Sequence, residues 1–357
     1  MPRAAQLADG REIFYFDESP APTPPVDPRR LPRLETEPTI RQDPLTGEWV
    51  TVAGHRQDRT HLPPADACPL CPSREGRQTE IPASSYDVVV IENRFPAFAA
   101  ATGDEAEDGS AWFREHRAAG RCEVICFSSD HAAAVSELSP GRLRTVLEAW
   151  TQRSAALAAL PSVEQVFCFE NRGEEIGVTL SHPHGQIYAY PFVTPRTEQL
   201  LSRAAGYHGR TGRNLFVDLL QAEVRTGDRV VLARDEWTAF VPFAARWPLE
   251  IHLHPNRRAR DFSELTDAAR DEFAEVYLEL LKRVEASFGA GIPYIAAWHQ
   301  APVRRARDLA QLHLQFFSIC RAPGKIKYLA GSESAMGAFI NDRSPEDTAR
   351  TLREVAL

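Results

Sequence analysis

Apolar residues in this chain fall into short runs and a few longer amphipathic stretches. Eight runs of four to seven residues are rich in β-branched and aromatic side chains, which is typical of strands: 48–52, 87–91, 122–127, 165–169, 238–243, 250–253, 294–298 and 313–319. Three stretches have helical spacing, at about 143–160, at 267–288 and after residue 345. Because the two kinds of element alternate irregularly, the pattern predicts a fold of the α+β class.

Two of the expected helices have clear start signals. Ser139-Pro140 and Ser344-Pro345 each place an N-cap residue before a proline at the first helical position. Glu346 and Asp347 then lie near the positive end of the helix dipole. We therefore expect helices to begin at these two serines.

The N-terminal segment has a different composition. Prolines are dense between residues 19 and 38, and no periodicity is visible there. Such a segment favours an extended backbone. We expect residues 1–40 to form an arm that lies on the body or on a partner subunit, with regular structure starting near Glu48.

An internal repeat is visible in the order of the elements. Residues 135–139, a long helix, an apolar run and the histidines near 182 are similar to residues 262–266, a long helix, an apolar run and the segment 312–315. The alternative is chance similarity of two short strings. Duplication would give halves at 41–205 and 206–357. Of the two equivalent segments, the one near 182 has a His-x-His sequence and 312–315 does not, so we expect the chemistry in the N-terminal half.

The bulk properties exclude several classes of function. The chain has 357 residues and a formal net charge of -8, which argues against non-specific nucleic-acid binding. No apolar run is long enough to span a membrane, and the N-terminus lacks the apolar core of a signal peptide. Six cysteines are too few for a disulfide scaffold in a chain of this length. We expect a cytoplasmic protein without a membrane partner.

The segment 181–188 is the strongest candidate for chemistry. In an extended backbone alternate side chains share a face, so His182, His184 and Gln186 are expected to point into one pocket. A lone histidine is often a surface or core residue, but two at this spacing are hard to explain by packing. Histidine readily acts as base, nucleophile or ligand.

A second candidate is the Cys68-Pro-Leu-Cys71 pair. Two thiolates at this spacing are typical of a metal knuckle, and a tetrahedral zinc needs two more ligands. His131 and His182 are the natural candidates. The alternatives are a redox pair or two buried small hydrophobic residues.

These motifs occur in an order that resembles one known family. The segments 43–49, 55–59, 68–71, 92–96, 124–131, 169–173, 182–186 and 327–333 resemble galactose-1-phosphate uridylyltransferases of the histidine-triad superfamily. The resemblance implies a duplicated histidine-triad-like unit, in which an antiparallel sheet forms a half-barrel with flanking helices. It also implies a homodimer with shared active sites.

The resemblance further implies a ping-pong reaction. His184 would attack the α-phosphorus of UDP-glucose, hold the uridylyl group covalently and pass it to galactose 1-phosphate. Gln186 stands where related hydrolases have a third histidine, and a carboxamide cannot act as general acid or base, which favours transfer over hydrolysis. The alternatives are a related transferase or phosphorylase with another acceptor, and a non-catalytic nucleotide-binding module.

Residues for substrate binding follow from the same resemblance. Arg56 and Arg59 would bind the diphosphate and reach the neighbouring subunit's site, and Asn93 and Phe95 would contact uridine. The remaining matched positions form two groups, one expected at the phosphates and one at the sugar: Asn171, Gly177, Val178 and Thr179, and then Lys327, Tyr328, Ser332 and Glu333.

A second metal site is expected to be incomplete. Bacterial members of the family bind iron through one glutamate and three histidines. Here His299 and His313 match, Gln315 replaces the last histidine, and Glu198 is the nearest carboxylate. Because two sure ligands bind a divalent ion poorly, we expect no tightly bound iron.

Overall fold

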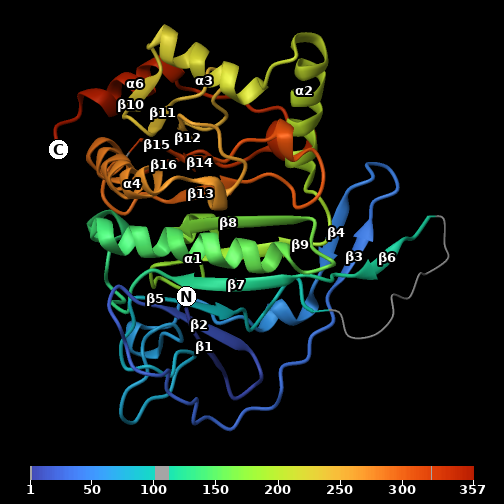
Figure 1. Cartoon of the computed structure of the whole chain (residues 1–357), viewed down its shortest axis with the longest axis vertical. Coiled ribbons are helices and arrows are strands. Elements are labelled where there is room, and N and C mark those ends of the chain that lie inside the picture. Colours follow the sequence, from blue (N-terminus) through green and yellow to red (C-terminus); the bar gives the residue numbers. More distant parts are fainter. Residues whose placement is uncertain (1, 101–111, 323) are drawn as a thin grey trace.

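The central feature of the computed structural model, which describes residues 2–100, 112–322 and 324–357, is a sheet of 11 strands (Figure 1). The strand order is β1-β2-β5-β7-β9-β8-β13-β14-β12-β11-β10, and every neighbouring pair is antiparallel. The strands are β1 Arg3–Gln6, β2 Glu12–Phe16, β5 Val88–Glu92, β7 Arg121–Cys126, β8 Gln165–Arg172, β9 His184–Tyr190, β10 Val230–Ala233, β11 Trp237–Phe240, β12 Leu249–Pro255, β13 Tyr294–His299 and β14 His313–Ser318.

Two smaller sheets and the helices complete the described chain. One sheet pairs β4 Trp49–Val52, β3 Thr39–Gln42 and β6 Glu115–Arg117, and the other pairs β15 Cys320–Ala322 with β16 Lys325–Ile326. The α-helices are α1 Pro140–Ala158, α2 Pro195–Thr211, α3 Leu215–Thr226, α4 Asp267–Phe288, α5 Gly331–Met336 and α6 Pro345–Glu354.

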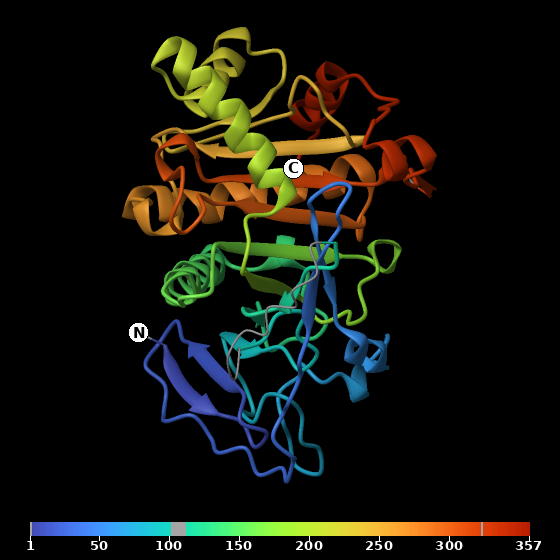
Figure 2. The ribbon, with the colours of Figure 1, turned by 90° about the vertical axis from the view of Figure 1, so that its right-hand side faces the viewer.

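The main sheet has two different faces. Helices α1 and α4 lie against one face, where Trp150 of α1 packs on Trp298 of β13 and Phe273 of α4 packs on the same tryptophan (Figure 1). In the C-terminal half α2 crosses the opposite side of the sheet (Figure 2). The largest hydrophobic cluster therefore fills the space under α1 and α4. On the other face a smaller cluster around Val89 and Ile91 lies beside the polar side chains of β9.

The order of strands and helices repeats within the sheet, as the sequence predicts. In the first half the order is β5-β7-β9-β8 with α1 between β7 and β8 in the chain; in the second it is β11-β12-β14-β13 with α4 between β12 and β13. The halves meet where β8 pairs with β13, at Phe169 and Ala297. Gln186 of β9 pairs with this phenylalanine and Gln315 of β14 with this alanine, so the two glutamines are equivalent.

The predicted helix starts are confirmed. The Ser139 Oγ accepts a hydrogen bond from the backbone N–H of Arg142, and the Ser344 Oγ accepts one from Asp347. Each bond satisfies one of the free N–H groups at a helix N-terminus. All eight predicted strand runs coincide with strands, with shifts of a few residues at their ends.

The prediction that regular structure starts near Glu48 is wrong. Strands β1 and β2 form a hairpin, and Ile13 of β2 pairs with Ile91 of β5, so this hairpin extends the main sheet. The hairpin was not expected because β1 reads Arg-Ala-Ala-Gln and has no apolar run. Residues 17–38 contain no helix or strand, in agreement with their proline content.

None of the helices within 2–100, 112–322 and 324–357 combines the length and apolar character needed to cross a bilayer.

Candidate active site

A pocket lies on the face of the sheet opposite α1, above β5, β7 and β9. His184 and Gln186 of β9, Val124 of β7 and Ile91 of β5 form its floor. Arginines surround this floor. The other residues that line the pocket are Arg11, Arg56, Arg59, Thr60, Pro69, Leu70, Glu80, Asn93, Arg94, Phe95, Thr179 and Leu180.

His184 is the first residue of β9 and has one free ring nitrogen. Its Nδ1 lies 2.7 Å from the carbonyl oxygen of His182. Because a carbonyl only accepts, Nδ1 carries the proton, and Nε2 keeps its lone pair. Burial lowers the pKa of His184, so the imidazole is neutral near pH 7 and can act as a nucleophile.

Gln186 lies on the same face as His184 because one residue separates them in the strand. The residue between them, Gly185, points to the crowded opposite face. A Cβ there would lie 2.9 Å from the ring of Phe127 and 2.9 Å from the carbonyl oxygen of Phe169. Glycine therefore lets β9 lie close between its neighbours and fixes both polar side chains toward the pocket.

His182 does not share the pocket of Gln186, which corrects the prediction that all three side chains point the same way. Strand β9 begins only at His184, so the alternation of an extended strand does not reach His182. Its ring instead faces Cys71, with 3.7 Å between Nδ1 and the sulfur.

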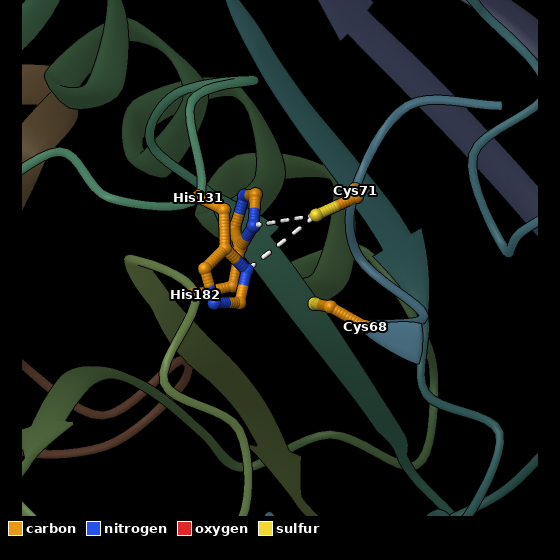
Figure 3. Close-up of side chains that lie close together, drawn as sticks. All are labelled: Cys68, Cys71, His131 and His182. Carbon is orange, nitrogen blue, oxygen red and sulfur yellow. Dashed lines mark hydrogen bonds between the residues drawn. The ribbon is translucent and has the colours of Figure 1, made fainter. Parts of the chain in front are cut away.

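Four predicted ligands come together in one cluster (Figure 3). The ligand atoms of Cys68, Cys71, His131 and His182 all lie within 4.8 Å of one another. The Cys71 sulfur is 3.4 Å from Nδ1 of His131. In a tetrahedral zinc site sulfur and nitrogen ligands are about 3.5 Å apart. The donor set and its spacing therefore fit a divalent metal of the zinc type.

Neighbouring groups hold the His182 ring in the orientation that a ligand needs. Its Nε2 lies 2.8 Å from the carbonyl oxygen of Ser128 and 2.9 Å from the Tyr86 hydroxyl, which donates to the carbonyl oxygen of Leu70. Nε2 is therefore protonated, and Nδ1 offers its lone pair to the cluster. Burial lowers the pKa of His182 to about 4, which keeps the ring neutral.

The two cysteines are not exposed at the surface: Cys68 is buried and Cys71 is half-buried. Burial and the neighbouring Cys68 raise the pKa of Cys71 to about 11. Two adjacent thiolates repel each other unless a cation lies between them, and a metal ion would supply that charge.

Arg56 and Arg59 line the pocket of their own chain, beside His184. The Arg56 Nη1 donates to the carbonyl oxygen of Phe95 at 2.8 Å, and the His55 ring is 2.9 Å from the carbonyl oxygen of Pro96. These bonds tie the 3₁₀ helix Gly54–Asp58 to the segment that follows β5. The expectation that both arginines reach the neighbouring subunit's site concerns a second copy of the chain and stays a prediction.

A second pocket lies on the other side of His184, and Asn171 and Val178 line it together with Arg172 and Glu174. The two pockets share His184 and Leu180. Thr179 lines the first pocket. Gly177 lines neither pocket and has a positive φ of 84°, in the turn that precedes Val178 and Thr179. The predicted phosphate segment therefore runs along both pockets.

The predicted sugar-binding residues lie elsewhere. Lys327, Tyr328, Ser332 and Glu333 line neither of these two pockets. Lys327 is buried and forms an ion pair of 3.0 Å with Glu333, and Tyr328 is 75% exposed. The chain does not bring these side chains to its own His184.

Three charged pocket residues were missed from the sequence. Arg11, Glu80 and Arg94 line the first pocket, and the Glu80 carboxylate accepts hydrogen bonds from both arginines. They are far apart in the chain and belong to no common motif. Only Arg94 carried a signal, because it lies between Asn93 and Phe95.

The expected ligands of a second metal assemble only in part: His299 and His313 pair across β13 and β14 with ring centroids 4.8 Å apart, but the carboxylate lies elsewhere. The Glu198 carboxylate is near the surface and pairs with Arg305. The Gln315 Nε2 donates to Nε2 of His313 at 3.2 Å, because the His313 Nδ1 is bound to the carbonyl oxygen of Gln311 at 2.9 Å. The lone pair of His313 is therefore already used, and this donor set does not fit an iron site.

A neutral histidine with one free nitrogen lies among arginines and beside the Cys/His cluster. This site defines a protein that can carry a phosphorus-linked group on an imidazole. Sequence comparison agrees. The profile of the galactose-1-phosphate uridyl transferase N-terminal domain matches residues 32–194, and that of the C-terminal domain matches residues 201–355. The chain belongs to the galactose-1-phosphate uridylyltransferase family.

Individual relatives cover almost the whole chain. The galactose-1-phosphate uridylyltransferase of Streptomyces lividans is 47% identical over 99% of this chain and 97% of the relative. That of Thermotoga maritima is 32% identical over 89% of this chain and 98% of the relative. A solved uridylyltransferase structure superposes with a TM-score of 0.79 at 32% identity, covering 88% of this chain and 97% of the other.

Proposed function

We propose that this chain exchanges a uridylyl group between UDP-glucose and galactose 1-phosphate, through a covalent intermediate on His184. The observation that carries the proposal is the free Nε2 of His184 in an arginine-lined pocket. Family membership and relatives named for this activity support it.

In the proposed first step the His184 Nε2 forms a bond to the α-phosphorus of UDP-glucose. The bond from that phosphorus to the bridging oxygen breaks, and glucose 1-phosphate leaves. In the second step a phosphate oxygen of galactose 1-phosphate attacks the same phosphorus and the P–N bond breaks. As the first bond forms the ring becomes positively charged, and the Nδ1–H bond to the carbonyl of His182 stabilises that charge.

The other predicted residues have roles that follow from their positions. Gln186 donates an amide hydrogen bond to a phosphoryl oxygen and cannot activate water. Arg56 and Arg59 bind the diphosphate of the substrate. Asn93 and Phe95 contact uridine, and Asn171, Gly177, Val178 and Thr179 form the phosphate-side wall.

A different acceptor is the main alternative. The chemistry at His184 would be unchanged for another hexose 1-phosphate or for inorganic phosphate, because acceptor choice depends on other side chains. The experiment is to incubate the protein with UDP-glucose labelled in the α-phosphate, isolate the protein, and then add each acceptor separately.

We expect label on the wild-type protein, no label on His184→Ala, and release of the label by galactose 1-phosphate. Label retained on His184→Ala would place the nucleophile elsewhere. Release by another acceptor alone would change the assigned reaction but keep the intermediate.

We also propose that Cys68, Cys71, His131 and His182 bind a structural zinc. The ring of His182 and the carbonyl that holds His184 belong to the same residue, so the metal would fix the backbone next to the nucleophile. When bound, zinc supplies folding free energy rather than a reacting group.

The active unit is proposed to be a homodimer with shared sites. If Lys327, Tyr328, Ser332 and Glu333 bind the sugar, a second copy must supply them, because they line neither described pocket of their own chain. Mixing inactive His184→Ala with an inactive Tyr328→Ala variant tests this. Recovery of activity after subunit exchange is expected, and no recovery would contradict sharing.

Two coarser inferences complete the proposal. The six free cysteines and the thiolate cluster suit a reducing compartment, so we propose a cytoplasmic location, which cell fractionation tests. We also propose that residues 41–205 and 206–357 are the two units of the duplication. That boundary lies within α2, so limited proteolysis should cut in the segments that flank this helix, 191–194 or 212–214, if the two units separate there.

A further inference from the structure

The N-terminal hairpin contributes to the pocket although the family profile begins only at residue 32. Strand β2 pairs with β5 along its length, from Ile13↔Ile91 to Phe16↔Val88. Arg11, the residue before β2, lines the same pocket as His184. A segment outside the matched profile therefore reaches the candidate active site.

Arg11 is held rigidly. Its side chain is 2% exposed, its Nε donates to Asp9 at 2.8 Å, and its Nη1 donates to the backbone carbonyl of Glu92 at 3.0 Å. Its Nη2 donates to the Glu80 carboxylate. The planar guanidinium thus fixes both Glu80 and the end of β5.

Glu80 in turn collects several arginines. Besides Arg11, its carboxylate accepts from Arg29 at 3.2 Å and from Arg94 at 3.0 Å. Both Arg11 and Arg29 come from the first 31 residues. These bonds orient Arg94, which is half-exposed and lies over the ring of Phe95 at 5.9 Å.

The register of the sheet places this network at one end of the pocket. Gln186 pairs with Val124, Val124 with Ile91, and Ile91 with Ile13. Adjacent strands are about 4.8 Å apart, so β2 lies roughly 14 Å from β9. A nucleotide whose phosphorus is at His184 can extend its nucleoside over the apolar side chains of Val124 and Ile91 toward Arg94.

The polar groups described at this end are donors. Arg11 and Arg94 only donate, and the Glu80 oxygens already accept from three arginines. The Asn93 Oδ1 accepts from the backbone N–H of Phe95 at 2.8 Å, which leaves its NH₂ group for a ligand. Uracil presents two carbonyl acceptors and one N3–H donor, whereas cytosine has an amino donor in place of one carbonyl and adenine has an amino donor and no carbonyl.

We propose that the N-terminal hairpin is part of the nucleotide site and sets its preference for uracil. Arg94 donates to a base carbonyl, and Arg11 is a positioning residue that acts on Arg94 through Glu80. This inference deepens the proposed function, since it rests on a phosphorus placed at His184.

The test is calorimetric binding of UMP, CMP and AMP to the full chain, which needs no turnover. Arg94→Met removes the donor and keeps the side-chain length. We expect UMP affinity to fall roughly ten- to a hundredfold, the usual effect of losing a charge-assisted hydrogen bond, and the preference for UMP over CMP to disappear. Arg41→Ala, which removes an exposed arginine paired with Glu115 outside the pocket, is the control and leaves both unchanged.

Arg11→Lys tests the positioning role, because lysine keeps the buried charge but not the three-way fork. We expect weaker UMP binding and lower selectivity in the wild-type background, and no further loss in the Arg94→Met background. Unchanged UMP affinity and selectivity in Arg94→Met would overturn the proposal, and so would a fully additive loss in the double variant.

Thermal unfolding shows whether each variant is folded, and Arg94→Met alone decides the matter if Arg11→Lys does not fold. The outcome is separable from the proposed function. Failure to label His184 would remove the transferase mechanism while the binding preferences could still hold, and labelling with unaltered preferences would remove only this inference.

Discussion

His313 occupies in the C-terminal half the position that His184 occupies in the N-terminal half. Each donates from Nδ1 to the carbonyl oxygen two residues earlier, at 2.9 Å and 2.7 Å respectively, and each precedes a glutamine by two residues. They differ in access. His184 opens into two pockets, whereas His313 is 3% exposed, and its Nε2 accepts from Gln315.

Alanine substitution at each of the two histidines should therefore show that only His184 carries the chemistry, although the two positions are equivalent in the duplication. We expect His184→Ala to abolish uridylylation, with loss of at least a thousandfold in turnover because no other described group lies at the same place. His313→Ala should keep the label on the protein and lose only stability. Single-turnover labelling checks this, and equal loss in both variants would contradict it.

Removal of one metal ligand should lower stability as well as activity. Cys71→Ser should reduce bound zinc from one equivalent to well below one and lower the melting temperature, because structural zinc contributes directly to folding. Cys320→Ser is the matched control, since its side chain donates to the carbonyl oxygen of Ala322 at 3.3 Å and lies outside the Cys/His cluster. Elemental analysis measures the bound zinc, and thermal melts measure the melting temperature. A Cys71→Ser protein with full zinc would refute the ligand assignment.

Two glycine-to-alanine substitutions should change the free energy of unfolding in opposite directions. Gly185→Ala places a methyl group 2.9 Å from Phe127 and from the Phe169 carbonyl, so we expect destabilisation of about 1–3 kcal/mol and reduced activity. Gly206→Ala lies within α2, where the nearest atom is 3.5 Å away, and should stabilise by about 0.5–1 kcal/mol. Urea unfolding measures both. A neutral Gly185→Ala would show that β9 can shift.

Glu170 should make stability depend on pH. Burial raises its pKa to about 7, although Tyr294 donates to it at 2.6 Å and Tyr277 at 3.4 Å. The folded state therefore holds this proton more tightly than the unfolded chain does. The contribution is fully present below about pH 4.5 and is lost as pH rises through 7, which amounts to about 3 kcal/mol.

Glu170→Gln should remove that part of the pH dependence. Compared with the wild type, the variant should gain stability between pH 5 and pH 8, as measured by urea unfolding at each pH. Glu148→Gln, on the exposed side of α1, provides the control. Parallel pH profiles for wild type and Glu170→Gln would contradict the prediction.

The sequence predicted the parts of this molecule that local pattern determines. The strand runs, the serine caps at Ser139 and Ser344, and the Cys68–Cys71 pair depend on residue types at short spacing, whereas the two histidines of the cluster lie 60 and 111 residues from Cys71. The hairpin of β1 and β2 was not predicted, because β1 has little apolar character and the hairpin joins the sheet through pairing of β2 with the distant strand β5.

The same reason explains what was missed or misplaced at the site. Arg11, Glu80 and Arg94 meet only through the tertiary fold. His182 was misplaced because the start of β9 at His184 is set by pairing with Cys126 of β7, which no spacing rule contains. The roles given to Arg56 and Arg59 and to the C-terminal sugar residues stay predictions.

The ladder between β8 and β13 makes the chain mechanically one body. Five residue pairs, from Tyr294↔Arg172 to Trp298↔Cys168, join the halves in the middle of the sheet. A hinge between the halves would have to break these backbone hydrogen bonds, so clamshell closure around a substrate is not available to this enzyme. Exchange of one sugar phosphate for another must instead occur by passage through the mouths of the two pockets, while the sheet beneath stays rigid.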